Sequence, residues 1–211
     1  MEIDVWSDVV CPWCYIGRRR LQAALAERDD LGDVTIRHRA FQLQPDAPKD
    51  LAVPTAEHLA HKYGVTPEQA REMQANVTEV AASVGLTYNL GATLSGNTED
   101  AHRLLLWAGD HGGQDELLER MYEAYFVNGR SLFDRESLLA LVGEAGLDVQ
   151  AAALVLDGDA YADQVSEDGA VAHQLGANGV PFFVFDMKYG ISGAQPAEVF
   201  TQTLDAALAS S

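Results

Sequence analysis

Two cysteines, Cys11 and Cys14, are the residues of this 211-residue chain whose type and spacing most clearly suggest chemistry. They enclose Pro12 and Trp13, and they follow an apolar stretch that alternates like a β-strand. A Cys-x-x-Cys pair between a strand and a helix is typical of thiol–disulfide exchange: the first sulfur attacks a disulfide, and the second resolves the mixed disulfide. We therefore predict that this pair is redox-active.

The predicted helix over residues 12–28 explains why Cys11 would be the attacking sulfur. Pro12 suits the first turn of a helix, and the apolar stripe of Ile16, Leu21 and Leu25 continues from it. Free backbone N–H groups and the positive end of the helix dipole stabilise an anion at such a start. Because Trp13 carries no charge, the helix end must supply most of the stabilisation of a Cys11 thiolate.

Two other interpretations of the cysteine pair are weaker. A Cys-x-x-Cys pair is half of a zinc site, which needs a second pair or two well-placed histidines. The chain has no third cysteine, and His58 and His61, one helical turn apart, are better explained as solvated residues on a helix. We therefore predict no metal site. A pair of buried structural thiols is the remaining alternative, and the strand-to-helix context makes it less favourable.

The surrounding elements predict an α/β fold built from both ends of the chain. Strands over residues 3–7 and 34–41 flank the first helix, and such a β-α-β unit is right-handed with parallel strands. Near the end, a helix over residues 161–175 precedes a strand over 182–185. The order is then completed by a strand over 188–191 and a helix over 196–208, which gives β-α-β … α-β-β-α.

The middle of the chain has helical periodicity only, so we predict an all-helical insertion. Thr66, Pro67 and Gln69 form the start signal of one helix, with Gln69 in the capping-box position. Further helices are expected near residues 97–107, 115–126, 134–145 and 148–156. The predicted domains are a discontinuous one, residues 1–48 plus 159–211, and a helical insertion over residues 49–158.

Composition limits the classes of partner. The chain is 47% hydrophobic, and its 32 acidic and 14 basic residues give a formal net charge of −18. The negative electrostatic potential of such a charge repels nucleic acid and anionic lipid, so we expect neither as a partner. Acidity is concentrated in residues 42–158, with 18 acids against 7 bases. No signal segment or membrane-length apolar stretch is visible, and we expect a cytoplasmic location.

Four segments together resemble the DsbA-like thioredoxin-fold thiol:disulfide oxidoreductases, most closely the FrnE-type branch. The active-site segment is residues 8–17 (DVVCPWCYIG), and residues 97–103 (NTEDAHR) are similar to an element of the family's helical insertion. Residues 179–183 (GVPFF) resemble its proline loop, and residues 191–196 (ISGAQP) its last strand-to-helix junction. The likeness spans essentially the whole chain and implies a thioredoxin-like fold.

The resemblance also implies roles for individual residues. Cys11 would be the nucleophile and Cys14 the resolving thiol, and Pro181 would be a cis-proline that faces them and exposes the backbone of Val180 to substrate. Asn97, His102 or Arg103 could line the cleft, and of these we favour Asn97. The predicted substrate-binding residues are Pro12, Trp13, Val180, Asn97 and Gln195.

Two other functions stay open. Glutathione-dependent 2-hydroxychromene-2-carboxylate isomerases and kappa-class glutathione transferases share the scaffold, but they typically have serine at the first active-site position. A non-catalytic partner-binding protein with a vestigial Cys-x-x-Cys is the third possibility. We expect thiols and disulfides of proteins or small molecules as partners. We expect no resident cofactor, although glutathione or another small thiol could serve as co-substrate.

Overall fold

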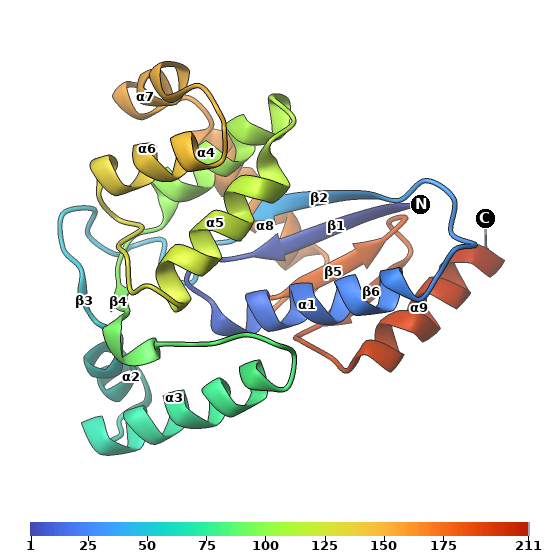
Figure 1. Cartoon of the computed structure of the whole chain (residues 1–211), viewed down its shortest axis with the longest axis horizontal. Coiled ribbons are helices and arrows are strands. Elements are labelled where there is room, and N and C mark those ends of the chain that lie inside the picture. Colours follow the sequence, from blue (N-terminus) through green and yellow to red (C-terminus); the bar gives the residue numbers. More distant parts are fainter. Residues whose placement is uncertain (211) are drawn as a thin grey trace.

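The central sheet of the computed structural model, which describes residues 1–210, brings together the two ends of the chain (Figure 1). Its strands lie in the order β2–β1–β5–β6, with β1 parallel to β2 and antiparallel to β5. Trp6 near the end of β1 pairs with Phe182 at the start of β5. The strands are β1 (Glu2–Ser7), β2 (Thr35–Ala40), β5 (Phe182–Phe185) and β6 (Tyr189–Ser192).

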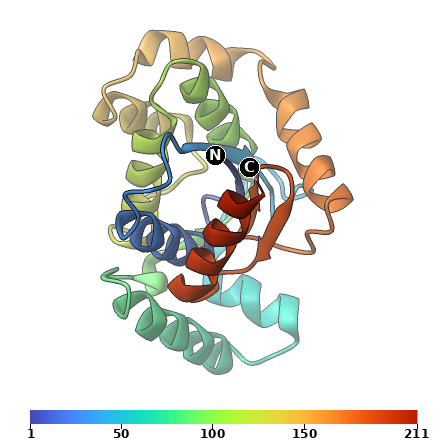
Figure 2. The same cartoon turned by 90° about the vertical axis from the view of Figure 1, so that its right-hand side faces the viewer.

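Helices cover both faces of this sheet and confirm the predicted β-α-β … α-β-β-α order. On one face, α1 (Pro12–Ala26) lies beside α9 (Ala197–Ala209), where Leu21 and Phe200 pack with Phe183 (Figures 1 and 2). On the other face, α8 (Ala162–Gln174) packs against Trp6 and Val184 through Ala172. Strand β5 is buried on both faces, which explains its continuous apolar sequence.

The segment between β2 and α8 is mainly helical, as predicted, with one correction. It contains two short antiparallel strands, β3 and β4, that pair only two residues each, so the insertion is not all-helical. Two residues are too few for alternation to be recognised in a sequence. The elements are β3 (Val53–Pro54), α2 (Thr55–Tyr63), α3 (Pro67–Ala82), η1 (Leu90–Ala92), β4 (Leu94–Ser95), α4 (Glu99–Asp110), α5 (Gln114–Phe126), α6 (Arg135–Glu144) and α7 (Val149–Asp157).

The local signals in the sequence are mostly confirmed. Thr66 and Gln69 form the predicted reciprocal capping box at the start of α3. The last hairpin turns through Asp186 and Met187, both with positive φ, and its second strand begins one residue later than predicted. Helix α4 begins at Glu99 and ends three residues beyond its predicted end.

The insertion shares one hydrophobic core with the first helix of the sheet domain. Tyr15 of α1 stacks on Tyr122 of α5, with ring centroids 4.7 Å apart, and Tyr88 stacks on Phe126 at 4.8 Å. Cys14 belongs to the same buried cluster. The division into two domains at residues 48 and 159 stays a prediction. Within residues 1–210, no helix is long and apolar enough to cross a membrane.

Candidate active site

The two cysteines lie where the end of β1 turns into α1. Cys11 is the N-cap residue of the helix, Pro12 occupies its first turn, and no side chain caps the free N–H groups there. The turn is held by a hydrogen bond from the Cys11 N–H to the Asp8 carbonyl oxygen, 3.1 Å long. Both sulfurs are free thiols. A thiolate at Cys11 therefore meets the open start of a helix, as the sequence predicts.

Both cysteines are buried: Cys11 is 4% exposed and Cys14 is 2% exposed. For Cys14, burial raises the pKa of the thiol well above the ordinary value. Hydrogen bonding with Cys11 and the charges of Cys11 and Asp8 raise that pKa further, against a smaller opposing effect of the Asp8 backbone. The Cys14 thiol is therefore protonated at neutral pH, which suits a residue that acts second.

The turn before β5 faces the first cysteine from the neighbouring strand. The Cys11 Sγ donates to the carbonyl oxygen of Val180, 3.6 Å away. The bond between Val180 and Pro181 is cis, and the Pro181 carbonyl oxygen accepts from the Gly193 N–H at 2.8 Å. The predicted juxtaposition of Pro181 with the cysteine turn is therefore present, because β1 and β5 are antiparallel neighbours.

Gly17 allows α1 to approach the Pro181 turn. A Cβ atom at this position would lie 3.0 Å from Pro181 Cγ and 3.1 Å from the Phe183 ring. We expect Gly17→Ala to force these groups apart and to lower the free energy of unfolding by about 1–3 kcal/mol, the usual cost of overpacking. Urea denaturation of the variant and the unmodified protein measures this difference in the free energy of unfolding.

The matched control for this glycine is Gly169→Ala in α8, where an added Cβ meets nothing within 4 Å. This variant should gain about 0.5–1 kcal/mol from its better helix propensity. If both alanine variants are stabilised equally, close packing at Gly17 is not what places the Pro181 turn.

A cavity of about 300 Å³ opens beside Cys11, between the cysteine turn and helices α2 and α3. Its wall is mostly apolar, and it reaches both the active-site turn and the residues before Pro181. Of the predicted substrate-binding residues, Pro12, Trp13 and Val180 line it. Trp13 is 39% exposed, so part of its ring is open to a partner.

Asn97 and Gln195, the other two predicted substrate-binding residues, do not line this cavity. The amide of Asn97 donates to the Ala47 carbonyl oxygen at 2.7 Å, and its oxygen accepts from the Glu99 N–H at 2.9 Å. Gln195 is exposed and donates to the carbonyl oxygen of Ser192 at 2.9 Å. Both side chains thus stabilise local backbone, and their role in binding stays a prediction.

His102 and Arg103 are buried structural residues of α4. The His102 Nε2 lies 3.2 Å from a carboxylate oxygen of Asp8, whose other oxygen accepts from the Leu43 N–H at 2.7 Å. This pair fixes the loop that leads into the cysteine turn. Arg103 donates to three carbonyl oxygens, those of Val155, Gly158 and Ala160. Neither residue lines the cavity.

Sequence patterns did not reveal Tyr88, which supports the cysteine turn from the insertion. Its hydroxyl donates to the Pro12 carbonyl oxygen at 2.7 Å, and its ring belongs to the aromatic stack on Tyr15. Burial raises the pKa of this hydroxyl far above its ordinary value. The phenol therefore stays a donor at every relevant pH. Tyr88 lies in an irregular segment, where no periodicity marks a residue as buried.

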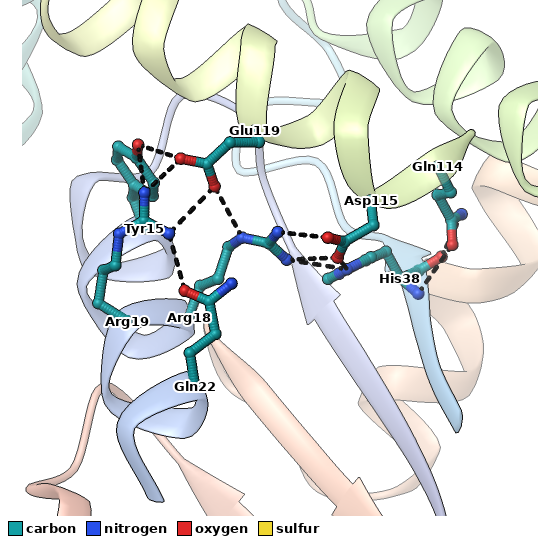
Figure 3. A network of polar contacts seen from close by, with 8 residues as sticks. All are labelled: Tyr15, Arg18, Arg19, Gln22, His38, Gln114, Asp115 and Glu119. Atoms are coloured by element: carbon teal, nitrogen blue, oxygen red, sulfur yellow. Dashed lines mark hydrogen bonds and ion pairs between the residues drawn. The ribbon is translucent and has the colours of Figure 1, made fainter. Parts of the chain in front are cut away.

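A network of charged side chains joins α1 to α5 beside the site (Figure 3). Arg18 is 7% exposed and donates to both oxygens of Asp115, at 2.7 and 2.8 Å. It also donates to Glu119 at 3.1 Å, and Glu119 accepts from the Tyr15 hydroxyl at 2.6 Å. Tyr15, which directly follows Cys14, is thus hydrogen-bonded to the insertion.

Acid should weaken this network through Asp115. Hydrogen bonds with His38 and Arg18 hold the pKa of the Asp115 carboxyl well below its usual range. A lowered folded-state pKa contributes stability above the unfolded value of about 3.9, and this contribution is lost as the pH falls below that value. We expect Asp115→Asn to make the free energy of unfolding fall less steeply between about pH 5 and about pH 3.

The exposed Asp46, for which the structure gives no hydrogen bond or ion pair, supplies the control for that experiment. Asp46→Asn should keep the slope of the unmodified protein over the same pH range. An Asp115→Asn variant with that same slope would mean that the Arg18–Asp115 contact contributes no net stability.

No group of three or more histidine, cysteine, aspartate or glutamate residues is placed to hold a metal ion in the part of the chain that the structure describes. His58 and His61, the pair noted in the sequence, both lie on α2. His58 faces the cavity beside Cys11.

Comparisons with known proteins agree with this geometry. A probable DsbA oxidoreductase, SCO1869 from Streptomyces coelicolor, is 45% identical, with a TM-score of 0.95 over 99% of this chain and 90% of that one. The cytosolic disulfide reductase DsbM from Pseudomonas aeruginosa, solved with GSH, is 18% identical, with a TM-score of 0.66 over 99% and 100%. A 2-hydroxychromene-2-carboxylate isomerase is also 18% identical, with a TM-score of 0.68 over 99% and 95%.

The last two likenesses are of fold alone, whereas a family model covers nearly the whole chain. The model of the DSBA-like thioredoxin domain matches residues 2–205, which include both ends of the sheet, the insertion and the cysteine turn. The sheet order, the Cys11–Cys14 turn and the Pro181 turn agree with that match. The chain therefore belongs to the DSBA-like thioredoxin domain family.

Proposed function

We propose that this protein is a thiol–disulfide oxidoreductase of the FrnE-type branch that exchanges disulfides through Cys11 and Cys14. The observation that carries the proposal is the placement of the two thiols. Cys11 lies at an open helix start, against the Val180 carbonyl oxygen and beside a cavity, while Cys14 is buried one turn behind it. In such a pair, one sulfur attacks the substrate disulfide and the other then resolves the mixed disulfide.

The exchange needs only the two thiols and a substrate disulfide. The Cys11 thiolate attacks one substrate sulfur, the substrate S–S bond breaks, and the first substrate thiolate leaves and takes up a proton. Cys14 then loses its proton and attacks the Cys11 sulfur, which releases the second substrate thiol. The substrate gains two electrons, and the Cys11–Cys14 disulfide carries the oxidation. The reverse sequence oxidises a dithiol.

The surface around Cys11 supports binding of an extended partner. The Val180 backbone faces the sulfur, and a peptide that lies along it could pair with it in the manner of an added strand. Pro12 and the partly exposed Trp13 line the same cavity and supply apolar contacts beside the sulfur. We propose these three residues as the substrate-binding surface.

A small thiol such as glutathione is the proposed co-substrate that returns the pair to its dithiol form. The glutathione complex of DsbM supports a small thiol as partner, as does the presence of a cavity of small-molecule size beside Cys11. The scheme requires no resident cofactor. The cytoplasmic location stays a prediction.

The test is stoichiometric exchange by the purified full chain. Reduced protein is mixed with a peptide that holds one disulfide, and the oxidised protein and reduced peptide are quantified by mass after acid quenching. We expect one peptide reduced per Cys11–Cys14 disulfide formed, and an equilibrium that follows the ratio of added thiol to disulfide. A variant with both cysteines replaced by alanine should reduce none. Protein that stays reduced in excess peptide disulfide at every thiol ratio would refute the proposal.

A further inference from the structure

The cavity beside Cys11 has an apolar wall and a size that suits a small molecule. Its volume of about 300 Å³ lies at the lower end of ligand cavities in proteins, which span about 300–1,000 Å³. One compact organic group fits this space better than a long peptide does. The main apolar lining residues are Leu43, Leu59, Met73, Val77, Leu90 and Phe126.

Helix α2 forms part of the cavity wall and is poorly covered by the rest of the protein. None of its residues is buried, although it contains Leu59 and Tyr63, both of which line the cavity. The helix contacts α3 and the short β3–β4 pair rather than the central sheet. Its apolar residues therefore face space that a ligand could fill.

Most polar side chains in the wall are already satisfied within the protein. The Gln74 amide donates to the Leu90 carbonyl oxygen at 3.1 Å, and Gln44 donates to the Ser95 hydroxyl at 2.8 Å. The hydroxyl of Thr93 donates to Leu90, and that of Tyr125 donates to Leu94. These groups have little capacity left to recognise a ligand.

Lys62 and His58, which lie one turn apart on α2, are among the lining residues that have no such partner. Across residues 1–210, no carboxylate lies within ion-pair distance of the Lys62 ammonium group, and His58 has no hydrogen-bond partner. Burial and the neighbouring charge of Lys62 lower the pKa of His58, so its imidazole is neutral at neutral pH. The ammonium group of Lys62 is therefore the one cationic group of the lining.

The ammonium group of Lys62 lies 5.8 Å from the centre of the Tyr63 ring, and the absence of a carboxylate partner among residues 1–210 is unusual in these surroundings. The insertion, residues 42–158, has 18 acidic residues against 7 basic ones, yet no aspartate or glutamate lines the cavity. The wall that contains Lys62 and Cys11 thus has no acidic side chain. Charge complementarity then favours a negatively charged ligand group beside Lys62.

We infer that the cavity binds small organic thiols and disulfides that join an apolar body to a carboxylate, and that Lys62 binds the carboxylate while Cys11 exchanges with the sulfur. This inference rests on the proposed function, because it assigns a class of small co-substrate to the same thiol. His58 supplies a neutral hydrogen-bond donor beside the same group. When Cys11 attacks the small disulfide, its S–S bond breaks and one small thiolate leaves for each mixed disulfide that forms.

Two aromatic disulfides that differ in charge test the inference. Each half of 5,5′-dithiobis(2-nitrobenzoate) carries a carboxylate, whereas 4,4′-dithiodipyridine is uncharged at neutral pH. Stopped-flow absorbance gives the second-order rate constant of each with the reduced full chain. We expect Lys62→Gln to lower the ratio of the carboxylate probe's rate constant to the neutral probe's by about three- to tenfold. Lys62→Arg should retain the ratio, and added salt should diminish the difference.

Lys188→Gln is the matched control, because it makes the same change in net charge in the β5–β6 turn, outside the cavity. It should leave the ratio unchanged. An unchanged ratio in Lys62→Gln, or an equal fall in both lysine variants, would overturn the inference while leaving exchange at Cys11 intact. Failure of both probes to react with Cys11 in the unmodified protein, judged against Cys11→Ser, would instead refute the proposed function.

Discussion

Replacement of Cys14 by serine is expected to stop the reaction at a stable mixed disulfide on Cys11. Attack by Cys11 does not need the second sulfur, but release of the substrate does. Burial and the neighbouring Cys11 keep the Cys14 thiol protonated until that step, so Cys14 does not compete with Cys11 for the substrate. Intact-mass spectrometry after incubation with a peptide disulfide should show one peptide half attached per protein, and the attached mass should disappear on reduction.

Cys11→Ser is the companion variant, and its effect should be larger. Loss of the attacking atom should lower the exchange rate by on the order of 10³-fold or more, as happens when an enzyme nucleophile is removed. Cys14 does not line the cavity beside Cys11, and its thiol has a raised pKa, so we expect it not to replace Cys11. Equal amounts of trapped peptide on the two variants would show that the order of attack is wrong.

Arg103→Leu is expected to have the largest effect on stability. The guanidinium group is 3% exposed and donates to carbonyl oxygens at the end of α7 and just before α8. Leucine would remove the donor from the buried carbonyl oxygen of Val155 and from the partly buried ones of Gly158 and Ala160. The cost is about 1–3 kcal/mol for a carbonyl group that water cannot reach and less for the other two. We expect a loss of about 3 kcal/mol, which corresponds to roughly 6–12 °C in Tm for a chain of this length.

Arg120→Leu provides the comparison, because Arg120 on α5 is 43% exposed and pairs with Glu116 along the helix surface. Its loss should cost much less than the loss of Arg103, because water screens an exposed ion pair. Thermal unfolding followed by circular dichroism measures both variants. A Tm of Arg103→Leu within a degree or two of the Arg120→Leu value would mean that the three carbonyl groups find other partners.

The sheet and its helices could be predicted because their signals are local. Alternation identified β1 and β2, and an apolar run identified β5, since each needs only neighbouring residues to be recognised. The capping box at Thr66 is likewise a pattern of four residues. The pairing of β3 with β4 joins residues about 40 positions apart over two residues each, and no local pattern records it.

The cavity could not be predicted for a related reason. Its wall combines the cysteine turn with α2, α3 and the segment around Leu90, which are distant in sequence. In the sequence alone, Lys62 is indistinguishable from any lysine near a helix end. Asn97 was favoured through resemblance to a family motif, but hydrogen bonds with Ala47 and Glu99 decide where its side chain points. Resemblance identifies the segment, whereas such contacts decide the direction of the side chain.

The aromatic stack between α1 and the insertion limits how this protein can be shortened. Tyr15, directly after the resolving cysteine, packs on Tyr122 and Phe126, and Tyr88 holds the Pro12 carbonyl group. A minimal protein made only of the sheet and helices α1, α8 and α9 would present this aromatic surface to water beside a reactive thiol. The insertion therefore cannot be removed without exposing the aromatic side chains that pack beside Cys14.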